Sequence, residues 1–297
     1  MAQQITLQEA VKMVPNMSTI FIGGFAHVRA CMAFSREMIR QKKHDMYFVS
    51  SGPTVHVDLL AAGRVITKME VAYSGIETIG PAPNVRRRIE DGDLQVEDYT
   101  NLTMTMRLYG GAIGVPFMPT KSMLGSDLEK KSLMKRLEEK MAVVACPFTG
   151  EAVALVPSIN PDVGVIQVQR VDTDGNVQID DALASDVDGL KASDMKIVLA
   201  EEIVSTDVIR KDPKKTVVPG LMVDFIVEVP HGAWPTAMYN FYDYDQDHIE
   251  MYAEKCRTEE GWEKYKKEWV LPSEEKILAK IGEKRLKQLK ARKTLGY

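Results

Sequence analysis

Residues 20–41, IFIGGFAHVRACMAFSREMIRQ, hold the clearest structural signal in the chain. The apolar run 20–25 has the length of a buried strand, and the glycine pair Gly23-Gly24 lies at its end. Apolar side chains then recur at helical spacing through 32–41. This stretch therefore predicts a buried strand, a glycine turn and a helix.

The same alternation continues along the chain. Seven more short apolar runs predict buried strands at 46–50, 69–73, 141–145, 153–156, 163–169, 197–200 and 225–229. Helical patterns lie at 7–13, 32–41, 55–62, 84–91, 101–113 and 126–140. Strands that alternate with helices predict an α/β fold, with an open, mostly parallel sheet covered by helices on both faces.

The C-terminal residues differ in composition from the rest. We predict one α/β domain over 1–270 and a basic helical extension over 271–297. In 273–293, eight Lys or Arg stand against three Glu, and one apolar stripe is formed by Ile277, Leu278, Ile281, Leu286 and Leu289. Two interpretations of this extension remain open: it binds a partner subunit, or it is a packing helix with a solvated face.

Composition narrows the class of protein. The 297 residues are 45% hydrophobic and 27% charged, which is ordinary for a globular chain with a substantial core. A net charge of -4 argues against nucleic acid or an anionic membrane as the main partner. No apolar run approaches the ~20 residues of a membrane span, and no secretory signal is recognisable. We therefore expect a cytoplasmic protein.

The cysteines and histidines give no sign of a metal site. Cys31, Cys146 and Cys256 are odd in number and far apart, as expected of a reduced protein without a disulfide framework. The five histidines include no pair at i, i+4, so no metal is predicted. The patterns GxxxxGK[ST], GxSxG, HExxH and CxxC are absent, and no complete catalytic centre is visible.

Three predicted strands end in glycine-containing segments. These are 23–25 (GGF), 50–53 (SSGP) and 74–77 (SGIE). Ligands of open α/β sheets bind outside the carboxyl ends of strands, where glycine lets the backbone approach closely. A structural turn would explain any one of them, but three in succession predict a crevice. Gly110, Gly111 and Gly114, late in a helical pattern, instead predict close packing of a helix rather than contact with a phosphate, and the turn 114–119 then ends this helix.

Nine short motifs, in order and at fixed spacing, resemble a known family. They are IGGF at 22–25, AAGRV at 61–65, APNVRR at 82–87, GVPFMP at 114–119, PFTGE at 147–151, EEI at 201–203, PGLMVD at 219–224, HGAWP at 231–235 and YDYD at 242–245. Over about 5–270 the chain resembles the A (alpha) subunits of class I CoA-transferases, and most of all those of the glutaconate CoA-transferase type.

The resemblance implies an active site that is shared by two different polypeptides. The nucleophile is a glutamate of the partner B subunit, in a Ser-Glu-Asn-Gly-like motif that this chain lacks, and it attacks the acyl-CoA thioester. An acyl anhydride and then a glutamyl-CoA thioester form, and CoA passes to a second carboxylate. The chain would thus be the A subunit of an acyl-CoA:carboxylate CoA-transferase, active only with its B subunit in an A2B2 or (AB)4 assembly. Coenzyme A would enter as a substrate, with no other cofactor.

Asn101 matches the position of a side-chain amide that supports the oxyanion in relatives. One such donor is worth roughly 3–4 kcal/mol. The alternative is that Asn101 only caps its helix. A related branch of ring-opening acyl-CoA hydrolases carries glutamate at this position. Asparagine cannot act as a base, which favours transfer over hydrolysis.

The resemblance also implies which residues line the cleft. Gly23, Gly24 and Phe25 would form its wall. Arg29 matches a basic residue that could bind a substrate carboxylate through two hydrogen bonds, although a surface arginine at a helix start is equally compatible.

Ser74, Gly75, Ile76 and Glu77 correspond to a loop close to the substrate. Glutaconate-specific members have serine near the position of Ile76, so isoleucine favours a less polar acyl group, aromatic or branched. Glu77 would hydrogen-bond the substrate, cap a helix or be solvated, and it is the nearest carboxylate for a hydrolase. Beside the transferase and the hydrolase, a third hypothesis for the whole chain is a non-catalytic acyl-CoA-binding or assembly protein.

Overall fold

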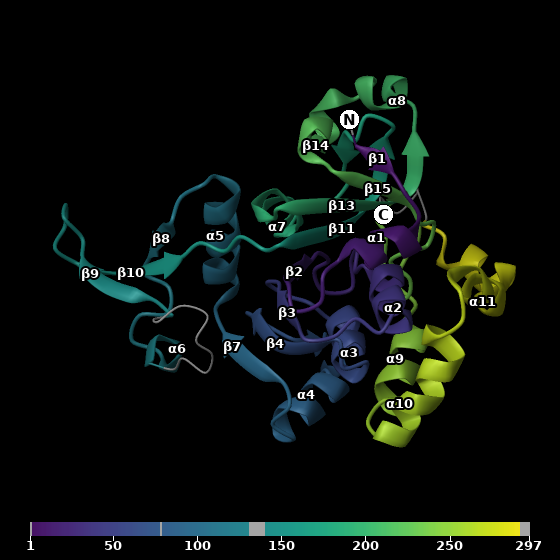
Figure 1. Cartoon of the computed structure of the whole chain (residues 1–297), viewed down its shortest axis with the longest axis horizontal. Helices are drawn as coiled ribbons and strands as arrows, with labels where there is room; N and C mark the ends of the chain where they lie inside the picture. The colour runs from purple at the N-terminus through teal and green to yellow at the C-terminus, as the bar shows by residue number, and fades with distance from the viewer. Residues whose placement is uncertain (1, 78, 131–139, 292–297) are drawn as a thin grey trace.

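A parallel sheet runs through the centre of the molecule (Figure 1). Its strands in spatial order are β1 (Gln3–Gln4), β15 (Phe225–Glu228), β13 (Met195–Val204), β11 (Val163–Asp172), β2 (Thr19–Ile22), β3 (Met46–Val49), β4 (Ile66–Val71) and β7 (Gln95–Asp98). The antiparallel strands β12 (Val177–Gln178) and β14 (Thr216–Val218) extend it from β11. This computed structural model describes residues 2–77, 79–130 and 140–291.

Helices cover both faces of the sheet, as predicted. Along β2, Ile20 and Ile22 point into one apolar cluster and Phe21 points into another, because successive side chains of a strand alternate. The first cluster includes residues of α1 (Leu7–Met13), α2 (Met32–Arg40), α3 (Val55–Ala62), α4 (Pro83–Glu90), α9 (Gln246–Lys255) and α10 (Glu259–Tyr265). The second includes residues of α5 (Asn101–Ala112) and α7 (Asp186–Ala192). The open, mostly parallel α/β fold is therefore confirmed.

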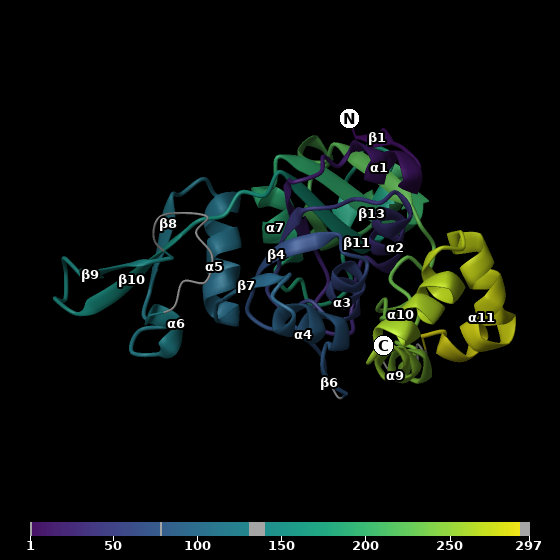
Figure 2. The ribbon, with the colours of Figure 1, turned by 60° about the horizontal axis from the view of Figure 1, so that its bottom comes forward.

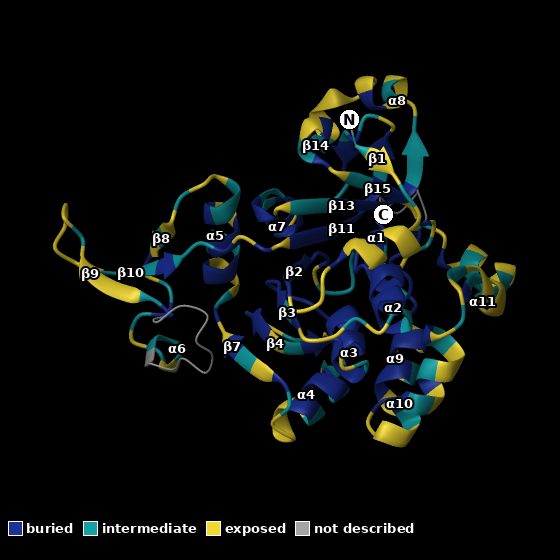
Figure 3. Cartoon of the chain, in the orientation of Figure 1, coloured by how far each residue is buried: buried dark blue, intermediate teal, exposed yellow. Residues whose placement is uncertain are grey.

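An antiparallel arm projects from the sheet at the α5 side (Figures 1 and 2). It consists of β8 (Phe117–Thr120), β10 (Ala152–Pro157) and β9 (Ala142–Ala145), with the short helix α6 (Asp127–Lys130) beside it. The sequence predicted buried strands at 141–145 and 153–156. Strands do form there, but β9 is exposed along its whole length, and neither belongs to the parallel sheet (Figure 3). The prediction of a buried strand at 141–145 was therefore wrong. At 153–156 a strand forms and buries Ala154 and Val156, but in the arm and not in the parallel sheet.

Further differences concern short segments. Strand β7 was not predicted, and β8 occupies part of what was predicted only as a turn, although the helix does end before Gly114, where φ is 75°. Of the helix predicted at 126–140, α6 is the described part, and 131–139 lie outside the described residues.

Of the three glycines predicted to pack closely, Gly110 and Gly111 of α5 do so, whereas a Cβ on Gly114 would meet nothing within 4 Å, so the prediction for Gly114 was wrong. A Cβ on Gly110 would lie 2.2 Å from the Ser158 hydroxyl oxygen. One on Gly111 would lie 2.2 Å from the Ile159 carbonyl oxygen and 3.0 Å from Cβ of Ala192 in α7. Side chains at these positions would force α5 away from its neighbours.

The C-terminal helices gather at the end of the molecule opposite the arm (Figure 2). After α10, a π-helical turn at Lys266–Val270 leads to α11 (Glu274–Leu289), which kinks at Gly282. Ile277 and Leu289 are buried in a cluster that includes Trp234, and Arg285 pairs with Asp245. Within this chain α11 is thus a packing helix. The division at residue 270 stays a prediction.

The connecting segments add little regular structure. They comprise α8 (Thr206–Arg210), the 3-10 turns at Pro213–Lys215 and Gly220–Met222, and the hairpin of β5 (Gly75–Ile76) with β6 (Gly80–Pro81). Over the described part of the chain, no helix has both the length and the apolar character needed to span a membrane.

Candidate functional site

The strand order reverses between β2 and β11. From β2 the chain proceeds outward through β3, β4 and β7, whereas β11, β13 and β15 fill the other half of the sheet. Ligands of such sheets bind at the carboxyl ends of strands where the order reverses. The loop that follows β2, residues 23–29, lies at this point.

The backbone of this loop is strained. Within six residues, φ is 103° at Gly24, 52° at Ala26 and 53° at Arg29. Positive φ is costly for residues that have a side chain, and such strain persists where surrounding contacts enforce it, commonly at functional sites. Here Gly52 O accepts a hydrogen bond from Ala26 N, and Ala237 O accepts one from Arg29 N.

Asp186, at the start of α7, fixes the glycine turn from the other half of the sheet. Its Oδ1 accepts a hydrogen bond from Gly24 N at 2.9 Å, and its Oδ2 accepts from Nε and Nη2 of Arg29 at 3.2 and 3.1 Å. The Arg29 guanidinium also pairs with Asp181 and donates to the Ala182 carbonyl oxygen. Burial raises the pKa of the Asp181 carboxyl, although Arg29 opposes this rise.

Arg29 is therefore buried, with only 1% of its surface exposed. The alternative of a surface arginine at a helix start is wrong. All three guanidinium nitrogens have partners within the chain, so its predicted contact with a substrate carboxylate would have to compete with Asp181 and Asp186. That contact stays a prediction.

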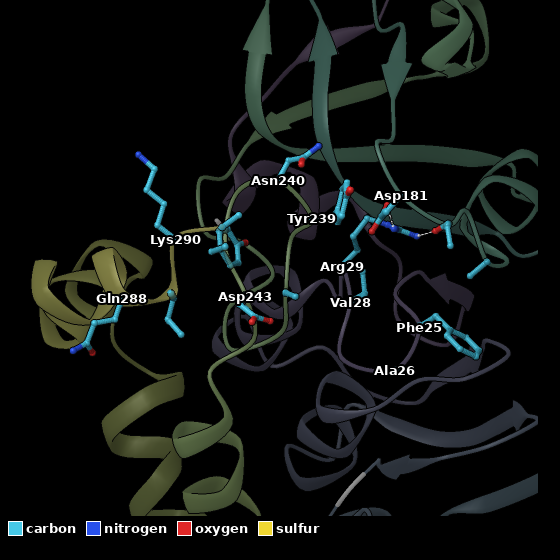
Figure 4. Close-up of a pocket in the computed structure, with 16 residues that line it drawn as sticks. Phe25, Ala26, Val28, Arg29, Asp181, Tyr239, Asn240, Asp243, Gln288 and Lys290 are labelled. Atoms are coloured by element: carbon cyan, nitrogen blue, oxygen red, sulfur yellow. Dashed lines mark hydrogen bonds and ion pairs between the residues drawn. The ribbon is translucent and has the colours of Figure 1, made fainter. Parts of the chain in front are cut away.

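A cavity of about 540 Å³ opens beside Arg29 (Figure 4). Its walls come from the loop after β2, from residues 181–184, from 237–243 and from the end of α11. Of the predicted site residues, Phe25 and Arg29 line it. Figure 4 shows Arg29 and Asp181 at one wall and Gln288 and Lys290 at the opposite one.

The loops after β2, β3 and β4 meet, but of the three glycine segments only the first lines the 540 Å³ cavity, through Phe25, so the crevice shared by all three stays a prediction. The Phe25 ring packs on Gly52, where a Cβ would lie 2.6 Å from the ring. Ser51 O accepts hydrogen bonds from the backbone N–H groups of Ala72 and Tyr73. The Ser51 hydroxyl also bonds that of Ser185, at 2.9 Å, next to Asp186.

The predicted substrate loop 74–77 divides between surface and core. Ile76 is fully buried in the larger apolar cluster, whereas Glu77 is exposed. The Ser74 hydroxyl oxygen is buried without a hydrogen-bond partner among the described residues, and Ser74 lines a second cavity of about 310 Å³. A Cβ on Gly75 would clash with the Tyr73 hydroxyl. Contacts of these residues with substrate stay predictions.

Asn101 is the first residue of α5 rather than its cap. Thr100 is the N-cap, and its side chain accepts a hydrogen bond from Thr103 N at 3.1 Å. The capping interpretation of Asn101 is therefore wrong. Its side chain is exposed and is not among the residues that line the 540 Å³ cavity. Its role at an oxyanion stays a prediction.

Sequence reasoning missed the carboxylates that support this region. Glu201 on β13 lies buried behind the cavity wall and accepts hydrogen bonds from the Tyr242 hydroxyl at 2.6 Å, Gln167 Nε2 at 3.1 Å and His231 N at 2.6 Å. Burial raises the pKa of Glu201 to about 7, although these donors act in the opposite direction. Asp181 and Asp186 were missed as well, because each lies more than 150 residues from the arginine that it binds.

Glu201→Gln is expected to remove a pH-dependent contribution to stability. Between the usual carboxyl pKa of 4.5 and the folded value of about 7, the unfolded chain loses a proton that the folded chain keeps. The contribution of Glu201 to the free energy of unfolding should therefore fall as pH rises through this window, by up to about 3 kcal/mol, and then level off. Urea unfolding at pH 5 and pH 7.5 should show that the stability of the wild type relative to Glu201→Gln falls by this amount, because the rise with pH from the buried histidines His56 and His248, whose pKa is lowered to about 3, is shared by both proteins. Exposed Glu254→Gln is the control, and parallel profiles for wild type and Glu201→Gln would contradict the assignment.

Comparison with known proteins adds independent evidence. The model of the family "Coenzyme A transferase" matches residues 4–229. An uncharacterized protein of Archaeoglobus fulgidus is 37% identical over 84% of this chain, which spans only about half (54%) of that protein. The A subunit of glutaconate CoA-transferase from Acidaminococcus fermentans is 34% identical, with 100% of this chain and 97% of that relative covered.

A second named relative and a solved structure agree. The A subunit of 3-oxoadipate CoA-transferase from Pseudomonas knackmussii is 30% identical over 95% of this chain and 99% of that relative. The crystal structure of the glutaconate coenzyme A-transferase of Acidaminococcus fermentans superposes with a TM-score of 0.95 at 32% identity, covering 100% of this chain and 98% of that one.

Proposed function

Because the chain belongs to the coenzyme A transferase family, we propose that it is the A subunit of a heteromeric acyl-CoA:carboxylate CoA-transferase. The family resemblance found in the sequence is confirmed. The observation that carries the proposal is the end-to-end match, in sequence and in fold, to the A subunit of a glutaconate CoA-transferase. Coenzyme A enters as a substrate, and we propose no other cofactor.

The nucleophilic glutamate belongs to the B subunit in this proposal. In the cavity of this chain, the Asp181 carboxylate is already paired with Arg29, and the Asp243 carboxylate accepts a hydrogen bond from Tyr244 N. The partner carboxylate attacks the thioester carbonyl carbon and expels the CoA thiolate, which leaves an acyl anhydride. The thiolate then attacks the anhydride on the enzyme side, releases the first carboxylate and leaves CoA on the glutamate.

This chain supplies a preorganised wall for that chemistry. Gly23 N donates to Val165 O and Gly24 N donates to Asp186, so these two N–H groups hold the turn in place, and contact of Gly23 and Gly24 with substrate stays a prediction. Asn101 is the amide that we propose for the oxyanion. A lower kcat at unchanged KM in an Asn101→Leu complex would support that role, and an unchanged kcat would exclude it.

The test uses the chain co-expressed with a candidate B subunit from a neighbouring gene. We would incubate the purified complex with a panel of acyl-CoAs and labelled acetate, and follow labelled acetyl-CoA by mass spectrometry and free CoA with a thiol reagent. Acetate-dependent labelled acetyl-CoA without free thiol is expected from the complex, and none from either of the two polypeptides by itself.

Two other outcomes would contradict the proposal. Hydrolysis of the thioester without label exchange would indicate the ring-opening hydrolase alternative, for which Glu77 is the candidate carboxylate. Binding of acyl-CoA without any turnover would indicate an assembly protein.

We further propose an A2B2 or (AB)4 complex, and light scattering of the purified complex distinguishes the two from each other and from the isolated chain.

A further inference from the structure

The walls of the 540 Å³ cavity are largely apolar. Five alanines line it, at positions 26, 182, 184, 237 and 291, and they leave room that larger side chains would fill. Val28, Leu289 and the rings of Phe25, Tyr239 and Tyr242 supply the rest of the apolar surface. Pockets for small ligands have volumes of about 300–1,000 Å³, so a space of this size suits a chain or ring of several carbons.

The charges of the cavity disfavour an anion at its inner end. Arg29 has both Asp181 and Asp186 as partners and is 1% exposed, so its positive charge is already neutralised. The other cation among the lining residues is Lys290, which is exposed. Asp181 and Asp243 also line the cavity. A ligand carboxylate brought inside would lose water and lie near like charges.

We propose that this cavity receives the tail of the acyl group and selects apolar acyl groups without a distal carboxylate. The inference rests on the proposed function, which identifies the ligand as an acyl-CoA. It is independent of Ile76, whose buried side chain does not line the cavity. The reason for the selectivity is the pairing of Arg29 within the chain together with the alanine-lined wall.

The test measures binding to the two-subunit complex in which the nucleophilic glutamate of the B subunit is replaced by glutamine, so that acyl-CoA binds without forming the anhydride. Acetyl-CoA, hexanoyl-CoA and glutaryl-CoA share the same CoA, so calorimetric Kd ratios isolate the acyl end. The Kd of hexanoyl-CoA should be lower than that of acetyl-CoA by a factor of about 10 or more, because its additional methylenes become buried. The Kd of glutaryl-CoA should be higher than that of hexanoyl-CoA by a factor of about 10 or more. Equal affinities for hexanoyl-CoA and glutaryl-CoA would overturn the inference.

Two variants locate the effect in this cavity. Ala237→Leu fills part of the space and should lower the affinity for hexanoyl-CoA about 10-fold, while the affinity for acetyl-CoA, whose acyl group is too short to reach this space, stays the same. Asp243→Lys places a cation in the wall and should raise the affinity for glutaryl-CoA relative to hexanoyl-CoA about 10-fold. The control Asp207→Lys makes the same charge change at an exposed position on α8 outside the cavity and should leave the ratio unchanged. Unchanged ratios in both cavity variants would place the acyl group elsewhere.

Failure of this inference can be distinguished from failure of the proposed function. If CoA moves from acyl-CoA to labelled acetate but the Kd ratios are near one, the transferase stands and the acyl assignment falls. If the ratios and variant effects are as expected but no acyl-CoA exchanges with acetate, the cavity binds apolar acyl groups and the transferase falls.

Discussion

Replacing Arg29 with methionine is expected to lower the free energy of unfolding by about 3–5 kcal/mol. Methionine matches much of the length of arginine but leaves the Asp186 carboxylate, which is 1% exposed, without the guanidinium that it faces at 3.1–3.2 Å. Desolvation of an unpaired buried carboxylate is the dominant cost. Urea unfolding at pH 7 measures the change.

The same experiment carries its own controls. Arg86→Met removes an arginine whose pair with Glu90 is exposed on both sides, and it should cost less than about 0.5 kcal/mol. Combining Arg29→Met with Asp186→Asn should recover part of the loss, because Asp186 is the more deeply buried of the two carboxylates that lose Arg29, and its charge is gone. If Arg29→Met were as mild as Arg86→Met, the buried ion pair would not be what holds the loop.

Gly24→Ala is expected to abolish most of the activity of the complex and to destabilise the chain. Its φ of 103° disfavours any side chain, and a Cβ would lie 2.6 Å from the Cα and 2.8 Å from the N of Ala30. Because these are backbone atoms, the loop itself must shift. A displacement of about 1 Å at a site of chemistry costs on the order of 100-fold in rate, and the strain and clash together about 2–4 kcal/mol in stability.

Gly92→Ala separates the two causes. Gly92 has a φ of 78°, but a Cβ there would meet nothing within 4 Å, so only the backbone cost of about 1–2 kcal/mol remains. Transfer activity of the complex and urea unfolding of the chain should both be measured for each variant. Equal destabilisation by the two substitutions, with full activity of Gly24→Ala, would show that the turn tolerates movement.

The central strands were predictable from sequence because their side chains are buried on both faces, which makes short continuous apolar runs. The edge strand β7, with the sequence QVED, escaped prediction because an edge needs few apolar residues. The opposite error came from β9, whose sequence AVVA suits a core although all four residues are exposed. Local composition shows that a strand can form, but not what covers it.

The site was partly predictable for a related reason. Gly24 and Gly52 stand out in the sequence because close approach of backbone or ring excludes a side chain at each. Asp186 gave no comparable signal, and Glu201 stood out only as part of the EEI motif at 201–203, because the role of each depends on partners distant in the sequence. The burial of Arg29 likewise depends on its distant partners Asp181 and Asp186, so no local pattern could distinguish a surface arginine from a buried one.

The pairing of β1 with β15 means that the sheet cannot be completed until late in the synthesis of the chain. Gln3 lies beside Phe225, and Gly24 is held by a carboxylate 162 residues further along. Translation proceeds at about 5–20 residues per second, so β15 is synthesised on the order of 10–40 s after β1, the strand with which it pairs. During synthesis the nascent N-terminal half must remain without the other half of its sheet, which makes protection by chaperones valuable. The glycine turn reaches its working shape only once most of the chain has emerged, so an incomplete chain has no finished cavity to occupy.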